Sequence, residues 1–222
     1  MTLDAYQIDI SNRIVLSGNL VGDAVQDYIT SVGIPFVSGG RFFTNGVDTR
    51  TRGADLIGTW PVQVSGSSLK FTGGINWNQT DITSIKPNPP QLGLVGLVLP
   101  VIDRASQGLM TVATPRTKAF VGADWGRGHW ALHGQLTRYG DWETLGSTPA
   151  GDQTYGSRVL LDASASYLLD RWRFTLGANN ILNTYPERNN TSNNFNGILT
   201  YPLSSPFGFN GAYWYATAAY RW

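Results

Sequence analysis

Apolar and polar residues alternate over much of the chain, most regularly in its last third. In segment 171–179 the apolar positions are Trp172, Phe174, Leu176 and Ala178. The intervening positions carry arginine, threonine, glycine and asparagine. A period of two is typical of a β-strand with one apolar and one polar face. We therefore predict a half-apolar strand here, and the same pattern predicts strands at 159–169 and 213–222.

The alternation predicts eight strands in all, with any helix confined to the long connections, for example around 22–32. The remaining five lie at about 2–16, 52–62, 70–77, 118–125 and 129–137. In the first of these, Tyr6, Ile8 and Ile10 form the expected apolar face, opposite Gln7 and Asp9. In the last third, Leu161, Ala163 and Ala165 share the expected outward face with Trp172, Phe174 and Leu176, whereas Asp162, Ser164, Arg173 and Thr175 are expected to point inward.

Long and short connections alternate without exception between these strands. The long ones are 17–41, 79–115, 139–157 and 183–213, and the short ones are 65–68, 126–128 and 170–171. A soluble sandwich also shows alternating strands, but it has no reason to collect its long loops at one end. Outer-membrane barrels do, because their periplasmic turns are short and their extracellular loops long. The pattern favours an antiparallel transmembrane meander.

Aromatic residues gather beside the short connections. They are Trp60, Phe71, Trp125, Trp130 and Trp172, joined at the chain end by Tyr220 and Trp222. Aromatic rings are favoured at membrane interfaces, so we expect a periplasmic girdle here. Trp77 and Trp214 are expected at the opposite interface.

Composition narrows the function classes. The 222 residues contain 16 Lys+Arg and 15 Asp+Glu, a net charge of +1, and charged residues make up only 14%. This balance provides no basic surface for a nucleic-acid backbone, so no nucleic-acid partner is expected. There is no cysteine, which excludes disulfides and thiol catalysis. The residues 1–6 lack the basic and apolar regions of a secretory signal peptide.

No segment predicts a membrane-spanning helix. The longest apolar run, 92–102, is interrupted by two glycines and a proline, and it is shorter than the roughly 20 residues that a spanning helix needs. A membrane location would therefore require strands closed into a barrel, because lipid cannot satisfy open backbone groups.

No catalytic group, metal site or cofactor is predicted. His129 and His133 have a spacing that would bring them together on a helix. On a strand they are about 13 Å apart, too far to share one ion. We find no constellation for nucleophilic or acid–base catalysis, so the sequence does not indicate an enzyme.

Several segments, in order, resemble the C-terminal barrel portion of TonB-dependent outer-membrane receptors. They are Leu161–Tyr167, Arg173–Asn183, Tyr185-Pro186, Ser205–Gly211 and the final aromatic strand, with weaker likeness at Tyr6–Ile14 and Thr51–Leu56. The resemblance implies that residues 1–222 form about eight strands of a larger barrel, without the family's plug domain. It also implies uptake of a siderophore, cobalamin or carbohydrate, with TonB acting only through the missing plug region.

The expected partners follow from this resemblance: outer-membrane lipid, lipopolysaccharide and the barrel-assembly machinery. Aromatic residues in the long loops are the candidate ligand contacts, namely Tyr28, Phe36, Trp142, Tyr155, Tyr201, Phe207 and Phe209. The candidate assembly signal is the terminal strand with Trp214, Tyr220 and Trp222. Two alternatives stay open at this point: a small self-contained outer-membrane pore, and a soluble β-sandwich that acts as a binding module.

Overall fold

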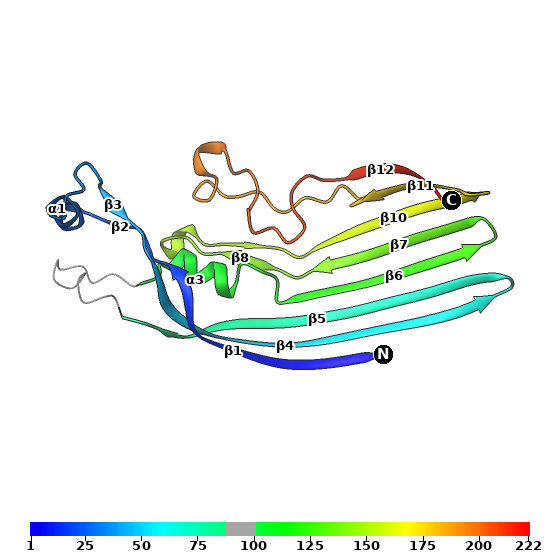
Figure 1. The fold of residues 1–222 in the computed structure, drawn as a ribbon, viewed down its shortest axis with the longest axis horizontal. Coiled ribbons are helices and arrows are strands. Elements are labelled where there is room, and N and C mark those ends of the chain that lie inside the picture. The colour runs from blue at the N-terminus through cyan, green and yellow to red at the C-terminus, as the bar shows by residue number, and fades with distance from the viewer. Residues whose placement is uncertain (88–100) are drawn as a thin grey trace.

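Eight antiparallel strands form a single sheet in the computed structural model, which describes residues 1–87 and 101–222 (Figure 1). The strands pair in chain order, each with the next strand of the sheet. They are β1 (Thr2–Leu16), β4 (Phe43–Val64), β5 (Ser67–Ile85), β6 (Thr117–Arg127), β7 (Trp130–Tyr139), β10 (Arg158–Leu169), β11 (Trp172–Asn179) and β12 (Tyr213–Tyr220). The predicted antiparallel meander of about eight strands is confirmed. Within the described residues, β1 and β12 are the two open edges of the sheet.

Three two-residue turns connect the hairpins β4–β5, β6–β7 and β10–β11. They are Ser65-Gly66, Gly128-His129 and Asp170-Arg171. The first residue of each has a positive φ, namely 38° at Ser65, 57° at Gly128 and 52° at Asp170. Positive φ at this position matches the twist of tight hairpins. The three short connections are therefore confirmed.

The long connections extend from the opposite end of the sheet, where they carry all the short elements (Figure 1). These are β2 (Leu20–Val21), α1 (Asp23–Ser31), β3 (Gly39–Gly40), α3 (Arg104–Thr111), β8 (Trp142–Thr144), β9 (Gln153–Tyr155) and two short 3₁₀ turns, Pro149–Gly151 and Phe195–Gly197. The helix expected around 22–32 is present as α1. No helix in the described part of the chain is long and apolar enough to cross a membrane. Most of the apolar run 92–102 lies outside the described residues.

Two strands are longer than predicted. β4 begins at Phe43 rather than near residue 52, and β5 continues to Ile85 into the expected loop 79–115. These extensions carry polar side chains on both faces, with Thr49 of β4 on one face and Asp48 and Arg50 on the other, so they lack the apolar period that marks the rest of each strand. The short hairpin β8–β9 was missed because three-residue strands are too short to show a period. Helix α3 lies in the long connection 79–115, in agreement with the prediction that helices are confined to the long connections.

Strand register brings the apolar positions of neighbouring strands onto one face of the sheet. Trp60 lies opposite Phe71, and the same hydrogen-bonded row continues through Ala123, Gly134, Ala163, Ala178 and Trp214. Directly opposed residues in an antiparallel pair share a face. The predicted grouping of Leu161, Ala163 and Ala165 with Trp172, Phe174 and Leu176 is confirmed.

The prediction for β1 was wrong. Tyr6 and Ile8 lie opposite Gly53 and Thr51, on the polar face of the neighbouring strand. The apolar face of β4 instead meets Gln7 and Asp9 at this height. Both are satisfied there by cross-strand arginines, Gln7 by Arg52 at 3.0 Å and Asp9 by Arg50 at 2.6 Å. The register of β1 against β4 therefore matches the polar pairs Gln7–Arg52 and Asp9–Arg50, and it does not place the apolar residues of β1 on the apolar face of the sheet.

The aromatic residues near the turns form a row that steps down the sheet. This turn-side aromatic row consists of Trp60, Trp125, Trp130, Tyr167, Trp172 and Tyr220. On each strand we count the residues between the aromatic residue and the residue that lies in the same hydrogen-bonded row as Trp60. The aromatic residue is closer to the short turns by two residues on β6, by four on β7 and β10, and by six on β11 and β12. The average step is about one residue per strand.

This step gives a strand tilt. One residue of rise, about 3.3 Å, for each strand spacing of about 4.8 Å corresponds to a slope of roughly 35°. Strands of membrane barrels tilt by about 35–45°. The turn-side aromatic row is therefore level when the strands tilt as in such a barrel, as a girdle at one membrane interface requires.

The same tilt places the opposite boundary of the apolar band. Arg52 on β4 and Arg138 on β7 each lie eight residues above the turn-side aromatic row. Trp214 on β12 lies six residues above the row, so the two arginines are two residues further along their strands. Eight residues at this tilt span roughly 22 Å, close to the roughly 25 Å apolar band of outer-membrane barrels. The apolar band on this face of the sheet thus ends at the level of Arg52 and Arg138.

The other face of the sheet is hydrogen-bonded and polar. Asp124 binds both Lys70 at 2.9 Å and His133 at 2.7 Å, across three adjacent strands. Ser166 and Thr175 are 2.7 Å apart on β10 and β11. Cross-strand polar pairs of this kind stabilise a water-facing sheet surface. In a barrel this face lines the lumen.

A small apolar core lies at the base of the long loops. Val15, Val47 and Ile102 are buried there, with Ile82 and Met110 packed against them. Met110 belongs to α3, which contacts β5. This contact positions the loop elements over the end of the sheet.

Aromatic rings cover glycines on the polar face, and one such pair yields a prediction. A Cβ at Gly177 would lie 2.5 Å from the Tyr215 ring and 2.9 Å from Ser164 Cβ. We expect Gly177→Val to destabilise the barrel by about 1–3 kcal/mol through overpacking. Denaturation in urea, followed by heat-modifiable gel mobility, measures this loss.

The matched control is Gly134→Val on the apolar face, where a Cβ meets nothing within 4 Å. Stability there should be unchanged or slightly improved, because valine is favoured in strands. Equal stability of the two variants would show that the close approach at Gly177 carries no energetic weight.

Candidate functional site

The candidate site is the group of long loops at the end of the sheet opposite the three tight turns. Helix α3 is the first element of this group. Asp103 caps its start by accepting a hydrogen bond from the Ser106 amide at 2.7 Å. Such caps satisfy amide groups that the first helical turn leaves free. The helix therefore begins at a fixed point, just after the buried Ile102.

An ion pair ties α3 to the β8–β9 hairpin. The Arg104 guanidinium binds both carboxylate oxygens of Asp152, with Nη2 to Oδ2 at 2.6 Å, and Nη1 also donates to the Gly146 carbonyl at 3.0 Å. The bidentate geometry is the strongest form of this pair. The hydrogen bond from Arg104 holds the pKa of Asp152 below its usual range.

This ion pair predicts an acid-dependent release of the hairpin. Because the folded pKa of Asp152 is depressed, the pair's contribution is complete above the ordinary aspartate value of about 3.9 and is lost as pH falls through the lowered value. A fluorophore on a single cysteine at Ser147 should report this step only below about pH 4. The variant Asp152→Asn should show no acid step. An unchanged step in that variant would assign it to another carboxyl group.

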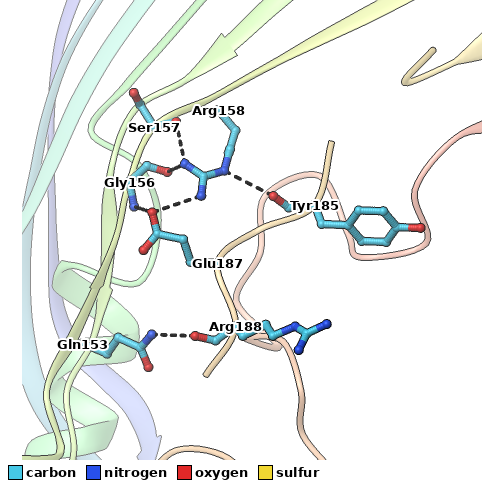
Figure 2. Close-up of polar contacts among 7 residues, drawn as sticks. All are labelled: Gln153, Gly156, Ser157, Arg158, Tyr185, Glu187 and Arg188. Atoms are coloured by element: carbon cyan, nitrogen blue, oxygen red, sulfur yellow. Dashed lines mark hydrogen bonds and ion pairs between the residues drawn. The ribbon is translucent and has the colours of Figure 1, made fainter. Parts of the chain in front are cut away.

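Arg158 joins the start of β10 to the last long loop (Figure 2). Its Nη2 binds Glu187 Oε1 at 3.0 Å, and Nε donates to the Tyr185 carbonyl at 3.2 Å. Its Nη1 donates to the carbonyls of Ser157 and Gly156. Glu187 also accepts from the Gly156 amide at 3.2 Å. This guanidinium is committed to holding two loops together rather than to binding a ligand.

A second polar cluster connects the same two loops through hydrogen bonds between β9 and residues 188–190. Gln153 donates to the Arg188 carbonyl at 2.8 Å (Figure 2) and accepts from the Asn190 amide at 2.8 Å. Tyr155 donates to Asn189 Oδ1 at 2.7 Å. Burial raises the pKa of the Tyr155 hydroxyl further above neutral pH. The two loops thus form one cross-linked layer.

Three of the predicted aromatic contacts meet in this layer. The rings of Trp142 and Tyr155 stack at 5.3 Å, and Phe207 packs edge-on against Trp142 at 6.1 Å. Trp142 is 2% and Tyr155 0% exposed, so both rings are covered by the loops. Aromatic pairs of this geometry add stability beyond the area they bury.

The other four predicted aromatics are more accessible. Tyr201 stacks on Phe209 at 6.3 Å and on Tyr185 at 5.6 Å, in the last long loop. Tyr28 lies on α1 and is 41% exposed, and Phe36 follows α1 and is 99% exposed. The structure brings Trp142, Tyr155 and Phe207 together and leaves Tyr28 and Phe36 on a separate loop.

A cavity of about 250 Å³ lies between α3, the β8–β9 hairpin and the last loop. Leu109 and Leu145 form part of its apolar wall. Its polar groups come from Tyr155, Asn189 and Asn193. The Tyr155 hydroxyl and the Asn189 amide are hydrogen-bonded within the loops, so the cavity presents mainly aliphatic surface with a few polar groups at its wall.

The remaining sequence candidates lie along the sheet. Trp214 and Tyr220 are on the apolar face of β12, and Trp222 follows the strand. His133 pairs with Asp124 on the polar face, and His129 lies in a tight turn. No group of three or more potential metal ligands occurs in the described part of the chain.

Sequence reasoning missed the polar loop cross-links. Arg158, Glu187 and Gln153 belong to no motif, and their partners are mostly backbone carbonyls and amides. One available signal was the asparagine-rich segment 189–196, since asparagine hydrogen-bonds its own backbone and neighbouring loops.

The family model described as "TonB dependent receptor-like, beta-barrel" matches residues 1–181. This chain belongs to the TonB-dependent receptor-like β-barrel family. The match includes the first seven strands of the sheet and ends two residues after β11. A search of the curated proteins found no significant match.

Membership of this family places the sheet in the outer membrane. As a TonB-dependent receptor barrel, the protein is located in the outer membrane, where it acts as a receptor or transporter, and the family is not an enzyme type. The short turns of such barrels face the periplasm and the long loops face outward. The apolar face then contacts lipid, and the candidate site lies at the extracellular end.

The single sheet also bears on the soluble alternative. A β-sandwich needs two sheets packed face to face. The described residues contain one eight-stranded sheet and two two-stranded ribbons. A self-contained pore would need β1 paired with β12, and these strands are the open edges of the described sheet.

Proposed function

We propose that this protein takes up a scarce nutrient across the outer membrane with energy from TonB, the nutrient being a siderophore complex, cobalamin or a carbohydrate. The observation that carries the proposal is the cross-linked layer of extracellular loops on a receptor barrel. A rigid layer pre-organises binding groups and lowers the entropic cost of capturing a dilute ligand. TonB acts through a plug region rather than through these strands.

Within this proposal the seven loop aromatics divide into two roles. Tyr28, Phe36 and Phe209 are exposed and would contact ligand, together with the half-buried Tyr201, which stacks on Phe209. Trp142, Tyr155 and Phe207 would hold the loops in position, because their rings pack on one another. The exposed set is supported by the preference of binding hot spots for aromatic rings.

The proposal is tested by uptake in cells that express the full receptor. Radiolabelled ferric siderophores, cyanocobalamin and malto-oligosaccharides serve as probes, with and without TonB. We expect one probe class to require both proteins, and Phe36→Ala or Phe209→Ala to weaken its binding about tenfold. The matched control is Ile198→Ala, which removes an exposed loop side chain that is not aromatic. Uptake that persists without TonB, or equal losses in all three variants, would contradict the proposal.

We also propose lipopolysaccharide and the barrel-assembly machinery as partners. The first is supported by arginines at the outer boundary of the apolar band, and the second by the open edge of β12.

A further inference from the structure

A pocket of about 300 Å³ lies at the extracellular end of the sheet, where the connection from α3 to β6 runs beside β8. Two backbone hydrogen bonds frame it, from the Gly140 amide to the Thr117 carbonyl at 2.8 Å and from the Glu143 amide to the Val112 carbonyl at 2.9 Å. Val112 and Thr117 enclose four residues, whereas Gly140 and Glu143 enclose two. The connection therefore bulges out of the ladder, and a bulge re-aims the side chains that it carries.

The pocket brings charges of both signs together. Arg116 contributes a guanidinium from the bulge, and Asp141 and Glu143 contribute carboxylates from the neighbouring segment. Hydroxyl groups are added by Thr114, Thr117 and Thr154. Glu143 lies directly opposite Thr154 in the β8–β9 hairpin, so these two side chains share one face. One small pocket thus presents a cation, two anions and several hydroxyl groups.

These charged groups are not paired within the protein. Among residues 1–87 and 101–222, no ion pair includes Arg116, Asp141 or Glu143. Residues 88–100 contain no charged residue. Arg104 acts on Glu143 only beyond ion-pair distance, and its guanidinium is bound to Asp152 at 2.6 Å. The three charged groups of the pocket are thus free to bind a ligand.

Trp142 lines the same pocket with an unsatisfied donor. The residue is 2% exposed, and its Nε1 atom has no hydrogen-bond partner in the part of the chain that the structure describes. A buried donor without a partner costs free energy comparable to a lost hydrogen bond. A ligand that carries an acceptor group would satisfy this donor.

We propose that this pocket binds a free α-amino acid, with its carboxylate on Arg116 and its ammonium group between Asp141 and Glu143. A guanidinium binds a carboxylate through two parallel hydrogen bonds. Arg116 would repel a metal ion alone, and the two carboxylates would repel an anion alone, so a zwitterion is the ligand that these charges fit.

The size of the pocket supports a small ligand. Its volume of about 300 Å³ is at the low end of the range for ligand pockets. It suits an amino acid better than a siderophore complex or cobalamin. The site is separate from the exposed aromatic residues proposed to contact the nutrient, and the proposal does not rest on the identity of that nutrient.

The test uses the full receptor purified from outer membranes in detergent, and isothermal titration calorimetry measures binding without uptake. The probes are the common L-amino acids, supplied singly, and then the N-acetyl and methyl ester forms of those that bind. The N-acetyl form lacks the positive charge, and the methyl ester lacks the negative charge. We expect amino-acid binding, with each blocked form about tenfold weaker because it loses a charge-assisted hydrogen bond.

Variants identify the residue that binds each charge. Arg116→Gln should weaken binding of the amino acid about tenfold. It should not weaken binding of the methyl ester, which has no carboxylate. Asp141→Asn combined with Glu143→Gln should weaken binding of the amino acid by a similar factor, and it should not weaken binding of the N-acetyl form.

Arg188→Gln and Asp27→Asn are the matched controls. Each removes an exposed charge from a long loop, outside the lining of the pocket. Neither should alter amino-acid binding. All variants should keep heat-modifiable mobility, so that a loss of binding is not a loss of folding.

Three results would overturn the proposal. They are no binding of any amino acid at millimolar concentration, equal affinity for an amino acid and either blocked form, and equal losses in Arg116→Gln and Arg188→Gln. Calcium chloride is the last probe. Calcium that displaces the amino acid and binds Arg116→Gln more tightly than the unaltered receptor would also overturn it, because the two carboxylates would then form a cation site.

Discussion

Replacing Leu176 by arginine is expected to abolish assembly of the barrel in the outer membrane. Leu176 is 60% exposed on the lipid-facing surface, four residues above Trp172 and so midway across the apolar band. Arginine at the midplane of a membrane barrel costs about 2–4 kcal/mol. That cost is a large fraction of typical folding stability. Heat-modifiable mobility in isolated outer membranes measures the assembled fraction.

The matched change is Thr175→Arg on the neighbouring residue. Thr175 faces the lumen and bonds Ser166 at 2.7 Å, beside Arg173 on the same face. A charged side chain there stays in water, so we expect near-normal assembly. Similar assembly of both variants would show that the two faces of β11 are wrongly assigned.

Changing the terminal strand is expected to have the second largest effect. Trp214, Ala216, Ala218 and Tyr220 form the apolar face of β12, and the Tyr220 ring packs on Trp172 at 5.0 Å. Within the described sheet, β12 pairs only with β11 and offers a free edge. We propose that the barrel-assembly machinery recognises this strand together with Trp222. Strand addition at an open edge is a common mode of peptide recognition.

A graft tests this proposal. The last strand replaces the final strand of a reporter barrel, with Trp222 deleted, with Tyr220→Asp, or with Thr217→Asp as the control on the opposite face. We expect the first two to lose most membrane insertion, and the control to retain it because Thr217 pairs with Thr175 on the polar side. Full insertion without Trp222 would reduce this residue to an interfacial anchor.

The membrane part of the fold could be predicted because one physical pattern governs it. A strand between lipid and a water-filled lumen must alternate, so Trp172 to Ala178 shows its period directly. The turns were equally readable, since Gly128 and Asp170 take backbone angles that few residues favour. The same reasoning failed at Tyr6 and Ile8, where arginine pairs on the other face set the register.

The candidate site was less predictable for a related reason. Outside the membrane both faces of β4 and β5 are polar, so no period indicates where these strands end. The loop aromatics were found by residue type alone, and that type does not distinguish covered rings such as Trp142 from exposed ones such as Phe36. The cross-links through Arg158 and Gln153 depend on carbonyls brought together only by folding.

The apolar face of the sheet contacts lipid, with the strands tilted by roughly 35°. Spin labels on single cysteines measure depth directly, because the chain contains no other cysteine. Labels at Leu56, Val121 and Leu176 lie on three different hydrogen-bonded rows, with Ala216 directly opposite Leu176. All four labels should report the same depth, at the bilayer centre. Labels along the single row from Trp60 through Ala123 and Ala163 to Trp214 should pass from the periplasmic to the extracellular interface. Equal depth along that row, or equal oxygen accessibility at Thr175 and Leu176, would contradict the account.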